Sequence, residues 1–97
     1  MTVSLSTHVL DTGRGEPASG VRVELYSGGE VVAAGETDGE GRIARLAEEL
    51  EPGTYRLAFH PPSEFFSCVE LEIHLDDGHY HVPLLFAPFG CTSYRGS

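Results

Sequence analysis

Residues 69–81 read Val69-Glu-Leu-Glu-Ile-His-Leu-Asp-Asp-Gly-His-Tyr-His81, and this stretch holds the signals that decide the fold class. From Val69 to Leu75 every second residue is apolar, which is the period of a β-strand with one buried face. Residues 76–78 have a turn composition, so a new strand is expected from Tyr80 to Phe86. Pro83 has no N–H to donate and should therefore lie at a sheet edge or at an unbonded position.

The same alternation recurs on both sides of this stretch. Further strands are expected at residues 3–9, 21–26, 31–37, 42–46, 55–59 and 91–95, with Gly-rich and Asp-rich turns between them. One helical turn is expected at residues 47–51, just before Pro52-Gly53. About eight short strands with almost no helix predict an all-β fold, either an antiparallel β-sandwich in two sheets or a small barrel. The length predicts a single domain over residues 1–97.

Composition narrows the range of partners and compartments. The net charge is -9 and all six basic residues are Arg, so binding to nucleic-acid phosphates is not expected. An anion site on such a chain would have to use the planar donor fork of arginine. No apolar stretch approaches the ~20 residues of a membrane span, and the first residues do not resemble a signal peptide. Two cysteines form no disulfide framework, which predicts a cytoplasmic protein with reduced thiols.

Histidines lie on polar strand faces in two places. His8 alternates with the apolar residues of its strand and shares its polar face with Ser4 and Ser6. His79 and His81 are two residues apart, so both project from one face of their strand. Imidazole titrates near pH ~6.5 and can exchange protons at cellular pH. The pattern is compatible with acid–base chemistry, with a metal site or with an ordinary solvated face.

The chain closes on Tyr94-Arg95-Gly96-Ser97, which combines aromatic, cationic and hydroxyl groups. Chain ends normally fray, so an end with this composition is expected to dock at an interface.

Three stretches together resemble the 5-hydroxyisourate hydrolase branch of the transthyretin family. They are Leu5-Ser-Thr-His-Val-Leu-Asp11, His79-Tyr-His-Val-Pro-Leu-Leu85 and the terminal Tyr94–Ser97. The resemblance implies a transthyretin-like (prealbumin-like, immunoglobulin-type) β-sandwich of eight strands. It also implies a homotetramer, a dimer of dimers with active sites in the channel between them. The implied reaction converts 5-hydroxyisourate to 2-oxo-4-hydroxy-4-carboxy-5-ureidoimidazoline in urate catabolism, with no cofactor and no metal.

The resemblance also implies the site residues. Its catalytic positions match His8, Arg42, His81 and Ser97. Its substrate-binding positions match His79, Tyr94, Arg95 and Gly96, with Arg95 alternatively anchoring the tail. The turn Asp38-Gly-Glu-Gly-Arg42 leaves Arg45 open as the site arginine, and the resemblance does not say which histidine is base and which is acid.

Two departures from the family pattern affect the periphery. Residues 60–66 are short where relatives commonly carry a helix, so the helix is expected to be lost. Cys91 stands where relatives usually have an aromatic residue.

Three other functions compete with hydrolysis. A transthyretin-like binding protein would use the same channel for an apolar ligand and would need no ionisable groups there. A metal site could form at His79 and His81, with His8 as a third ligand, although zinc usually takes three or four protein ligands. An immunoglobulin-like adhesion or linker module would fit the turn sequences and leave the terminal residues unexplained.

Overall fold

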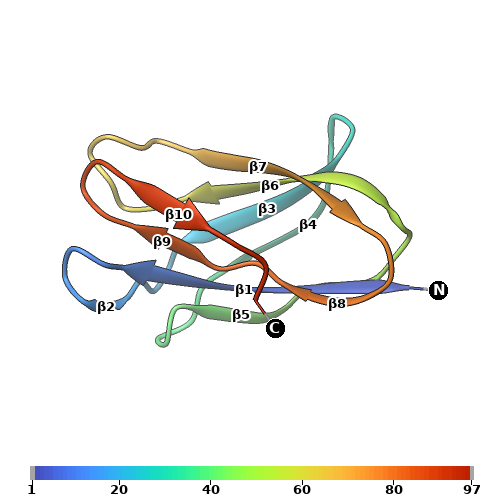
Figure 1. Cartoon of the computed structure of the whole chain (residues 1–97), viewed down its shortest axis with the longest axis horizontal. Coiled ribbons are helices and arrows are strands. Elements are labelled where there is room, and N and C mark those ends of the chain that lie inside the picture. The colour runs from blue at the N-terminus through green and yellow to red at the C-terminus, as the bar shows by residue number, and fades with distance from the viewer. Residues whose placement is uncertain (1, 97) are drawn as a thin grey trace.

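Ten β-strands make up the computed structural model, which describes residues 2–96 (Figure 1). They are β1 (Val3–Asp11), β2 (Glu16–Pro17), β3 (Arg22–Ser27), β4 (Glu30–Glu36), β5 (Arg42–Leu50), β6 (Gly53–His60), β7 (Val69–Leu75), β8 (Gly78–His81), β9 (Leu84–Phe86) and β10 (Cys91–Ser93). The all-β prediction is confirmed, with about ten strands in place of eight. No helix forms anywhere in residues 2–96, and so none of membrane-spanning length.

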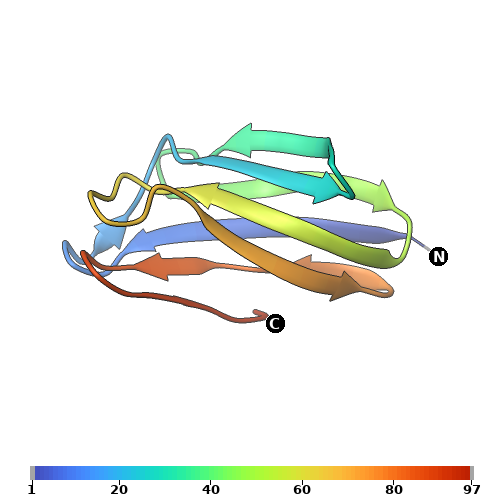
Figure 2. The ribbon, with the colours of Figure 1, turned by 90° about the horizontal axis from the view of Figure 1, so that it is seen from above.

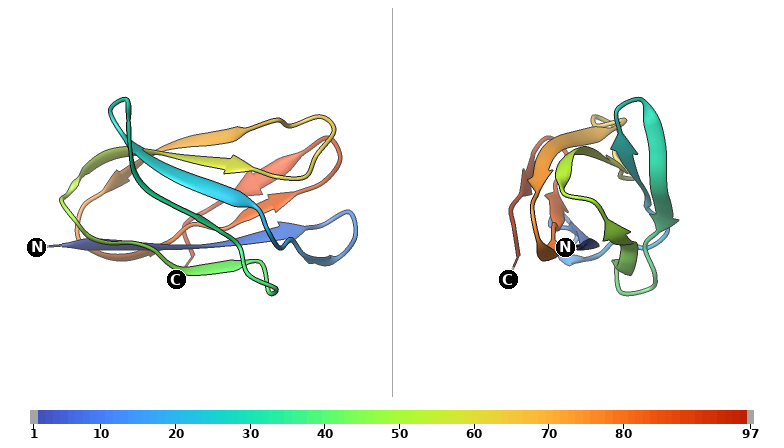
Figure 3. Two further views of the ribbon diagram at one scale, coloured as in Figure 1. Left: turned by 180° about the vertical axis from the view of Figure 1, so that it is seen from behind. Right: turned by 90° about the vertical axis from the view of Figure 1, so that its right-hand side faces the viewer.

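The strands form two sheets that face each other as the layers of a sandwich (Figure 2; Figure 3). β1 is the centre of the larger sheet: β8 and then β9 run parallel to it on one side, and β5 and β2 pair with it on the other. β10 closes this sheet beyond β9, and the second sheet has the order β4-β3-β6-β7. β1 is therefore in contact with β8, the strand that carries His79 and His81.

The core lies between the sheets and follows the alternation seen in the sequence. Its fully buried side chains include Val3, Leu5, Val9, Val23, Leu25, Leu57 and Phe59. Burying a side chain of this size contributes roughly 1.5–3 kcal/mol. Because successive residues of a strand point to opposite faces, the inward direction of Leu5 and Val9 turns Ser4, Ser6 and His8 outward.

The expected helical turn at residues 47–51 is wrong. β5 continues to Leu50, because Ala47 and Leu50 pair with Leu5 and Val3 of β1 and so extend the sheet. The extra residues of β5 are taken up by two register shifts, and Glu49 adopts a positive φ of 54°. Pairing with a long central strand overrides the local helical preference, which a single sequence window cannot reveal.

The strand expected from Tyr80 to Phe86 is divided at Val82-Pro83 into β8 and β9. Pro83 is fully buried and lies between the two ladders that β1 makes with these strands, which confirms the expected unbonded position. The segment from residue 61 to residue 68 contains no helix, as expected from its length. Cys91 lies on β10 opposite Phe86, away from the outward histidines of β8.

Candidate active site

The outward face of the larger sheet brings together three distant segments of the chain. Parallel pairing of β1 with β8 sets Ser4 beside His79 and Ser6 beside His81. Antiparallel pairing of β1 with β5 sets His8 beside Arg42. Because Ser6 is the register partner of His81, His8 lies two residues further along β1 on the same face and is a diagonal neighbour of His81. Two imidazoles and one guanidinium therefore share one surface.

Two serines and two histidines on this face form a continuous hydrogen-bonded chain. Oγ of Ser4 lies 2.7 Å from Nδ1 of His79, whose Nε2 lies 2.9 Å from Oγ of Ser6. The same Ser6 oxygen lies 2.7 Å from Nδ1 of His81. Ser6 is nearly buried, at 7% exposure, whereas His79 is exposed. The chain thus runs from solvent to His81, whose Nε2 bonds to no other described residue.

His8 is held by the turn that precedes β5. Its Nε2 lies 2.9 Å from the carbonyl oxygen of Glu40. A carbonyl oxygen only accepts hydrogen bonds, so Nε2 carries the hydrogen and Nδ1 of the neutral ring keeps its lone pair. The turn is fixed in its own right, because Oδ1 of Asp38 accepts bonds of 2.9 Å from the backbone N–H groups of Glu40 and Arg42.

The electrostatics of the site favour a neutral His81. Burial lowers the pKa of His81 below the ordinary histidine value of 6.5, and the charges of His8, Arg42 and His79 lower it further. The backbone N–H groups of Arg42 and Glu40 donate hydrogen bonds to Asp38 and lower the pKa of its carboxyl. The positive charges of Arg42 and His8 lower this pKa further. The positive charges of His8 and Arg42 thus act on both Asp38 and His81.

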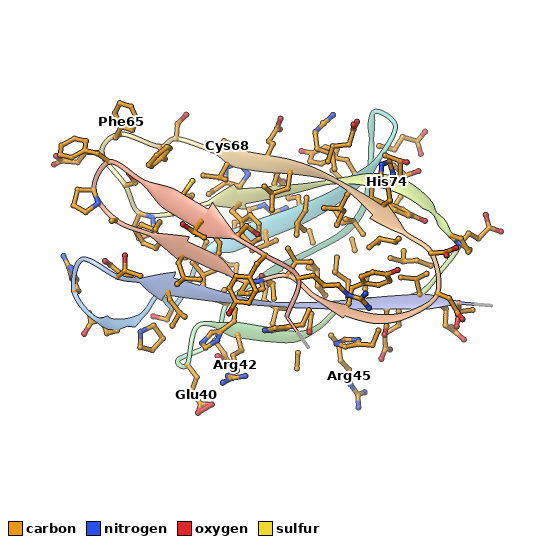
Figure 4. The ribbon with its side chains drawn as sticks, viewed as in Figure 1. Glu40, Arg42, Arg45, Phe65, Cys68 and His74 are labelled. Atoms are coloured by element: carbon orange, nitrogen blue, oxygen red, sulfur yellow. The ribbon has the colours of Figure 1, made fainter. Side chains whose placement is uncertain are left out.

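Arg42 and Arg45 occupy different positions on β5 (Figure 4). Arg42 pairs directly with His8, at the end of the strand next to Glu40. Arg45 lies in the irregular part of the strand, where no residue of β1 is its register partner, and approaches Glu48 at 3.8 Å. Its side chain is 81% exposed. The geometry therefore places Arg42, and not Arg45, beside His8.

The terminal segment folds back onto β8. The N–H of Gly96 donates to the carbonyl oxygen of His81 at 2.6 Å, and a Cβ at Gly96 would come within 2.7 Å of Cδ2 of the His81 ring. Only glycine leaves room for this imidazole. The guanidinium of Arg95 stacks over Tyr80, with 4.1 Å from its central carbon to the ring centroid. Arg95 is thus placed as a tail anchor.

The other expected residues of the tail differ in their placement. Tyr94 is 55% exposed, and by the register of the flanking pairs it lies level with Pro83. Ser97 lies outside the described residues.

Sequence reasoning missed the groups that support the histidines. Ser4 and Ser6 share the face of His8 at the strand period, which is a readable signal, but their bonds to His79 and His81 depend on the pairing of β1 with β8. The part played by Asp38 and Glu40 depends on the turn folding back beside β1.

Gly41 is the position in this turn where adding a side chain should destabilise the folded state most. Its φ is +77°, and a Cβ would lie 2.5 Å from the carbonyl oxygen of Val9. We expect Gly41→Ala to lower the free energy of unfolding by at least about 2 kcal/mol, because strained backbone and a backbone clash combine. Urea unfolding at one fixed protein concentration measures the change. Gly39→Ala in the same turn is the control, since a Cβ there meets nothing within 4 Å; equal unfolding midpoints for the two variants would contradict the expectation.

Two cavities, of about 550 and 660 Å³, are not lined by His8, Arg42 or His81. Tyr94 and Arg95 of the terminal segment line the first of them, together with Tyr80 and residues of β7. Across residues 2–96, no three His, Cys, Asp or Glu side chains are grouped as the ligands of a metal ion would be.

Comparison with known proteins identifies relatives over nearly the whole chain. The model of the HIUase/Transthyretin family matches residues 5–96. The 5-hydroxyisourate hydrolase of Deinococcus radiodurans is 43% identical over 115 aligned positions, covering 96% of this chain and 95% of that protein. The uric acid degradation bifunctional protein TTL of Arabidopsis thaliana is 39% identical, and the chain spans 37% of its length. The structure of Klebsiella pneumoniae 5-hydroxyisourate hydrolase superposes with a TM-score of 0.90 at 36% identity, covering all of both chains.

Proposed function

The chain belongs to the HIUase/Transthyretin family and is a hydrolase of 5-hydroxyisourate in urate breakdown, and we propose that His8, Arg42 and His81 are its catalytic residues. The observation that supports this assignment is their convergence: β1, β5 and β8 bring the three side chains to one face, and the charges of His8 and Arg42 act on His81. We include Ser97 in the proposal as a fourth catalytic residue, and Tyr94 and Gly96 as groups that bind the substrate or shape its site.

The reaction is addition of water to a ring carbonyl followed by cleavage of a ring C–N bond, with the nitrogen retained in the open-chain product. Water attacks the C6 carbonyl of the substrate, the bond from C6 to N1 breaks, and the product is the open-chain carboxylate. One group must remove a proton from water, one must give a proton to N1, and one must stabilise the charge that develops on the carbonyl oxygen.

The surroundings of the two imidazoles suggest different tasks for them. The pKa of His81 is lowered by burial and by the charges of His8 and Arg42, so its ring is held in the neutral form, which can take a proton from water. His8 has the carboxylate of Asp38 nearby as a counter-charge when it carries a proton, and its tautomer is fixed by Glu40. We assign His81 as the general base and the protonated form of His8, which takes its second proton from solvent on Nδ1, as the group that protonates N1.

Arg42 supplies the positive charge of the site. Its planar guanidinium can form two parallel bonds to a flat anion and can bind the oxygen on which charge develops. Arg42 forms no salt bridge with the acidic side chains of the described part of the chain, so its fork is available to a ligand. The polar character of this face also argues against the alternative that the chain carries an apolar ligand there. Such a ligand would have to displace water from two imidazoles and a guanidinium when it binds.

The direct test of the function is the ultraviolet decay of freshly prepared 5-hydroxyisourate. The protein should accelerate the decay at micromolar concentration, and variants of His8, Arg42 and His81 should be impaired while they remain folded. A decay rate equal to that of the protein-free sample would refute hydrolysis by this chain.

The pH dependence of kcat/KM tests the role of His81. The base must be neutral, and burial together with the nearby cations lowers its pKa below 6.5. Activity should therefore be retained as the pH falls to 6.5 and be lost only below it, as His81 becomes protonated. Rates measured from pH 5 to pH 9 in buffers of constant ionic strength give the midpoint of the acid limb; a midpoint above 6.5 would contradict this assignment.

The assembly and the compartment complete the proposal. Arg42 is exposed and His8 and His81 are half-buried, so a second copy of the chain packed on this face would shield the catalytic groups from water. We propose that this packing occurs in a homotetramer built as a dimer of dimers. Analytical ultracentrifugation measures the assembly. We further propose that residues 1–97 act as one domain, without cofactor or metal, in the cytoplasm, where the unpaired Cys68 and Cys91 would stay reduced.

A further inference from the structure

Ser6 has one hydroxyl hydrogen and two imidazole neighbours. Its Oγ lies 2.9 Å from Nε2 of His79 and 2.7 Å from Nδ1 of His81. A hydroxyl donates one hydrogen bond and accepts up to two. Ser6 can therefore donate to only one of the rings, and the other ring must donate to Ser6.

This restriction couples the tautomers of the two neutral rings. When His81 donates from Nδ1, Ser6 donates to Nε2 of His79, and His79 in turn donates from its Nδ1 to Ser4 at 2.7 Å. When the direction reverses, both rings carry their hydrogen on Nε2. The hydrogen-bonded chain thus has two states, and in each of them His79 and His81 are the same tautomer.

We propose that Ser4, His79 and Ser6 are positioning residues that form a proton relay, which sets the tautomer of His81 and carries its proton to solvent. The proposal rests on the proposed function, in which His81 is the base. It gives His79 a task other than direct contact with the substrate. In the first state of the relay, Nε2 of His81 has a free lone pair and can accept a proton from water.

The transfer balances at every group. Nε2 of His81 takes a proton from the attacking water, and Nδ1 of His81 releases its own proton to Ser6. Ser6 passes its hydroxyl proton to Nε2 of His79, Nδ1 of His79 passes its proton to Ser4, and Ser4 releases one to solvent. Every member is neutral before and after, and the net change is one proton moved from the attacking water to bulk water. The reverse sequence restores the first state: Ser4 takes a proton from solvent, and Nε2 of His81 returns one to a water molecule in the site after the product has left.

The charges around His81 explain why a relay is useful there. Arg42 on β5, His8 on β1 and His79 on β8 all disfavour a positive charge on the His81 ring, as does its burial. The terminal segment adds a further cation, Arg95, whose guanidinium stacks over the ring of Tyr80, the residue before His81. A relay lets His81 accept a proton without becoming an imidazolium in these surroundings. Ser4 is half-buried and His79 beside it is exposed, so the outer end of the relay has access to water.

Kinetics of Ser6→Ala test the relay in the full-length protein. We expect kcat to fall at least about tenfold with KM nearly unchanged, because the step of proton transfer is impaired while the substrate contacts remain. Ser6→Thr, which keeps the hydroxyl, should restore most of kcat. Thr54→Ala is the matched control, since it removes a 2.9 Å bond from a hydroxyl to Nδ1 of His74 on the other sheet. A Ser6→Ala protein with the parent kcat would overturn the relay.

The tautomers can be observed without turnover. Nitrogen-15 NMR of the parent, recorded without substrate and well above the ordinary histidine titration range, should show the same tautomer at His79 and His81. Opposite tautomers at His79 and His81 would overturn the relay. This test uses the parent protein, so it applies even if Ser6→Ala fails to fold. Such a result would leave the proposal that His81 is the base untouched. Full activity in a His81→Asn protein would instead overturn the proposed site, so the two failures are distinguishable.

Discussion

Replacing His81 by Asn should lower kcat/KM for 5-hydroxyisourate by about 10²–10⁴-fold, the range typical of positioned proton transfer. The Asn side chain occupies similar space and can still bond to Ser6, but it cannot take a proton from water at neutral pH. The loss should appear mainly in kcat, because the substituted group acts in the transition state. Steady-state rates of ultraviolet decay at several substrate concentrations measure it.

A matched histidine on the other sheet controls for structural damage. His74 lies on β7, is exposed, and like His81 bonds through Nδ1 to a hydroxyl, here that of Thr54 (Figure 4). His74→Asn should keep the parent rate, and both variants should keep the parent circular dichroism spectrum and unfolding midpoint. If His81→Asn hydrolyses the substrate at the parent rate, His81 is not the base.

Arg42→Gln should lower kcat/KM by about 10²–10³-fold, as the loss of one stabilising donor does in other sites where charge develops on an oxygen. The neutral amide can still accept and donate, but the positive charge and the two-pronged donor fork are gone. Arg42→Lys restores the charge without the fork, and we expect it to recover only part of the activity. Rates and KM values of the three proteins separate the contribution of charge from that of geometry.

Arg45→Gln is the control on the same strand. Its side chain is 81% exposed and its nearest acidic partner is Glu48 at 3.8 Å, so the substitution should change kcat/KM by less than about twofold. A large loss in Arg45→Gln together with a small one in Arg42→Gln would transfer the role of site arginine to Arg45.

Strand positions were predictable wherever the alternation of apolar residues was long. The buried faces of β1, β3 and β6 follow it, with Leu5, Leu25 and Leu57 fully buried as it requires. Prediction failed at residues 47–51, where local composition favours a helical turn and pairing with β1 extends a strand. It was also incomplete at Val82-Pro83, where one expected strand became two. Both differences come from partners that are distant in the sequence.

By itself, the sequence determined the fold class and the residue types available for chemistry. Period-two patterning needs only neighbours along the chain to separate a buried face from a polar one, and a net charge of -9 without lysine restricts any anion site to arginine. The tertiary structure decided which of these residues meet. Register between β1 and β8 joins Ser6 to two histidines, and register between β1 and β5 selects Arg42 over Arg45. Such pairings are set by the packing of two sheets around one core, so they are properties of the whole chain and not of any segment.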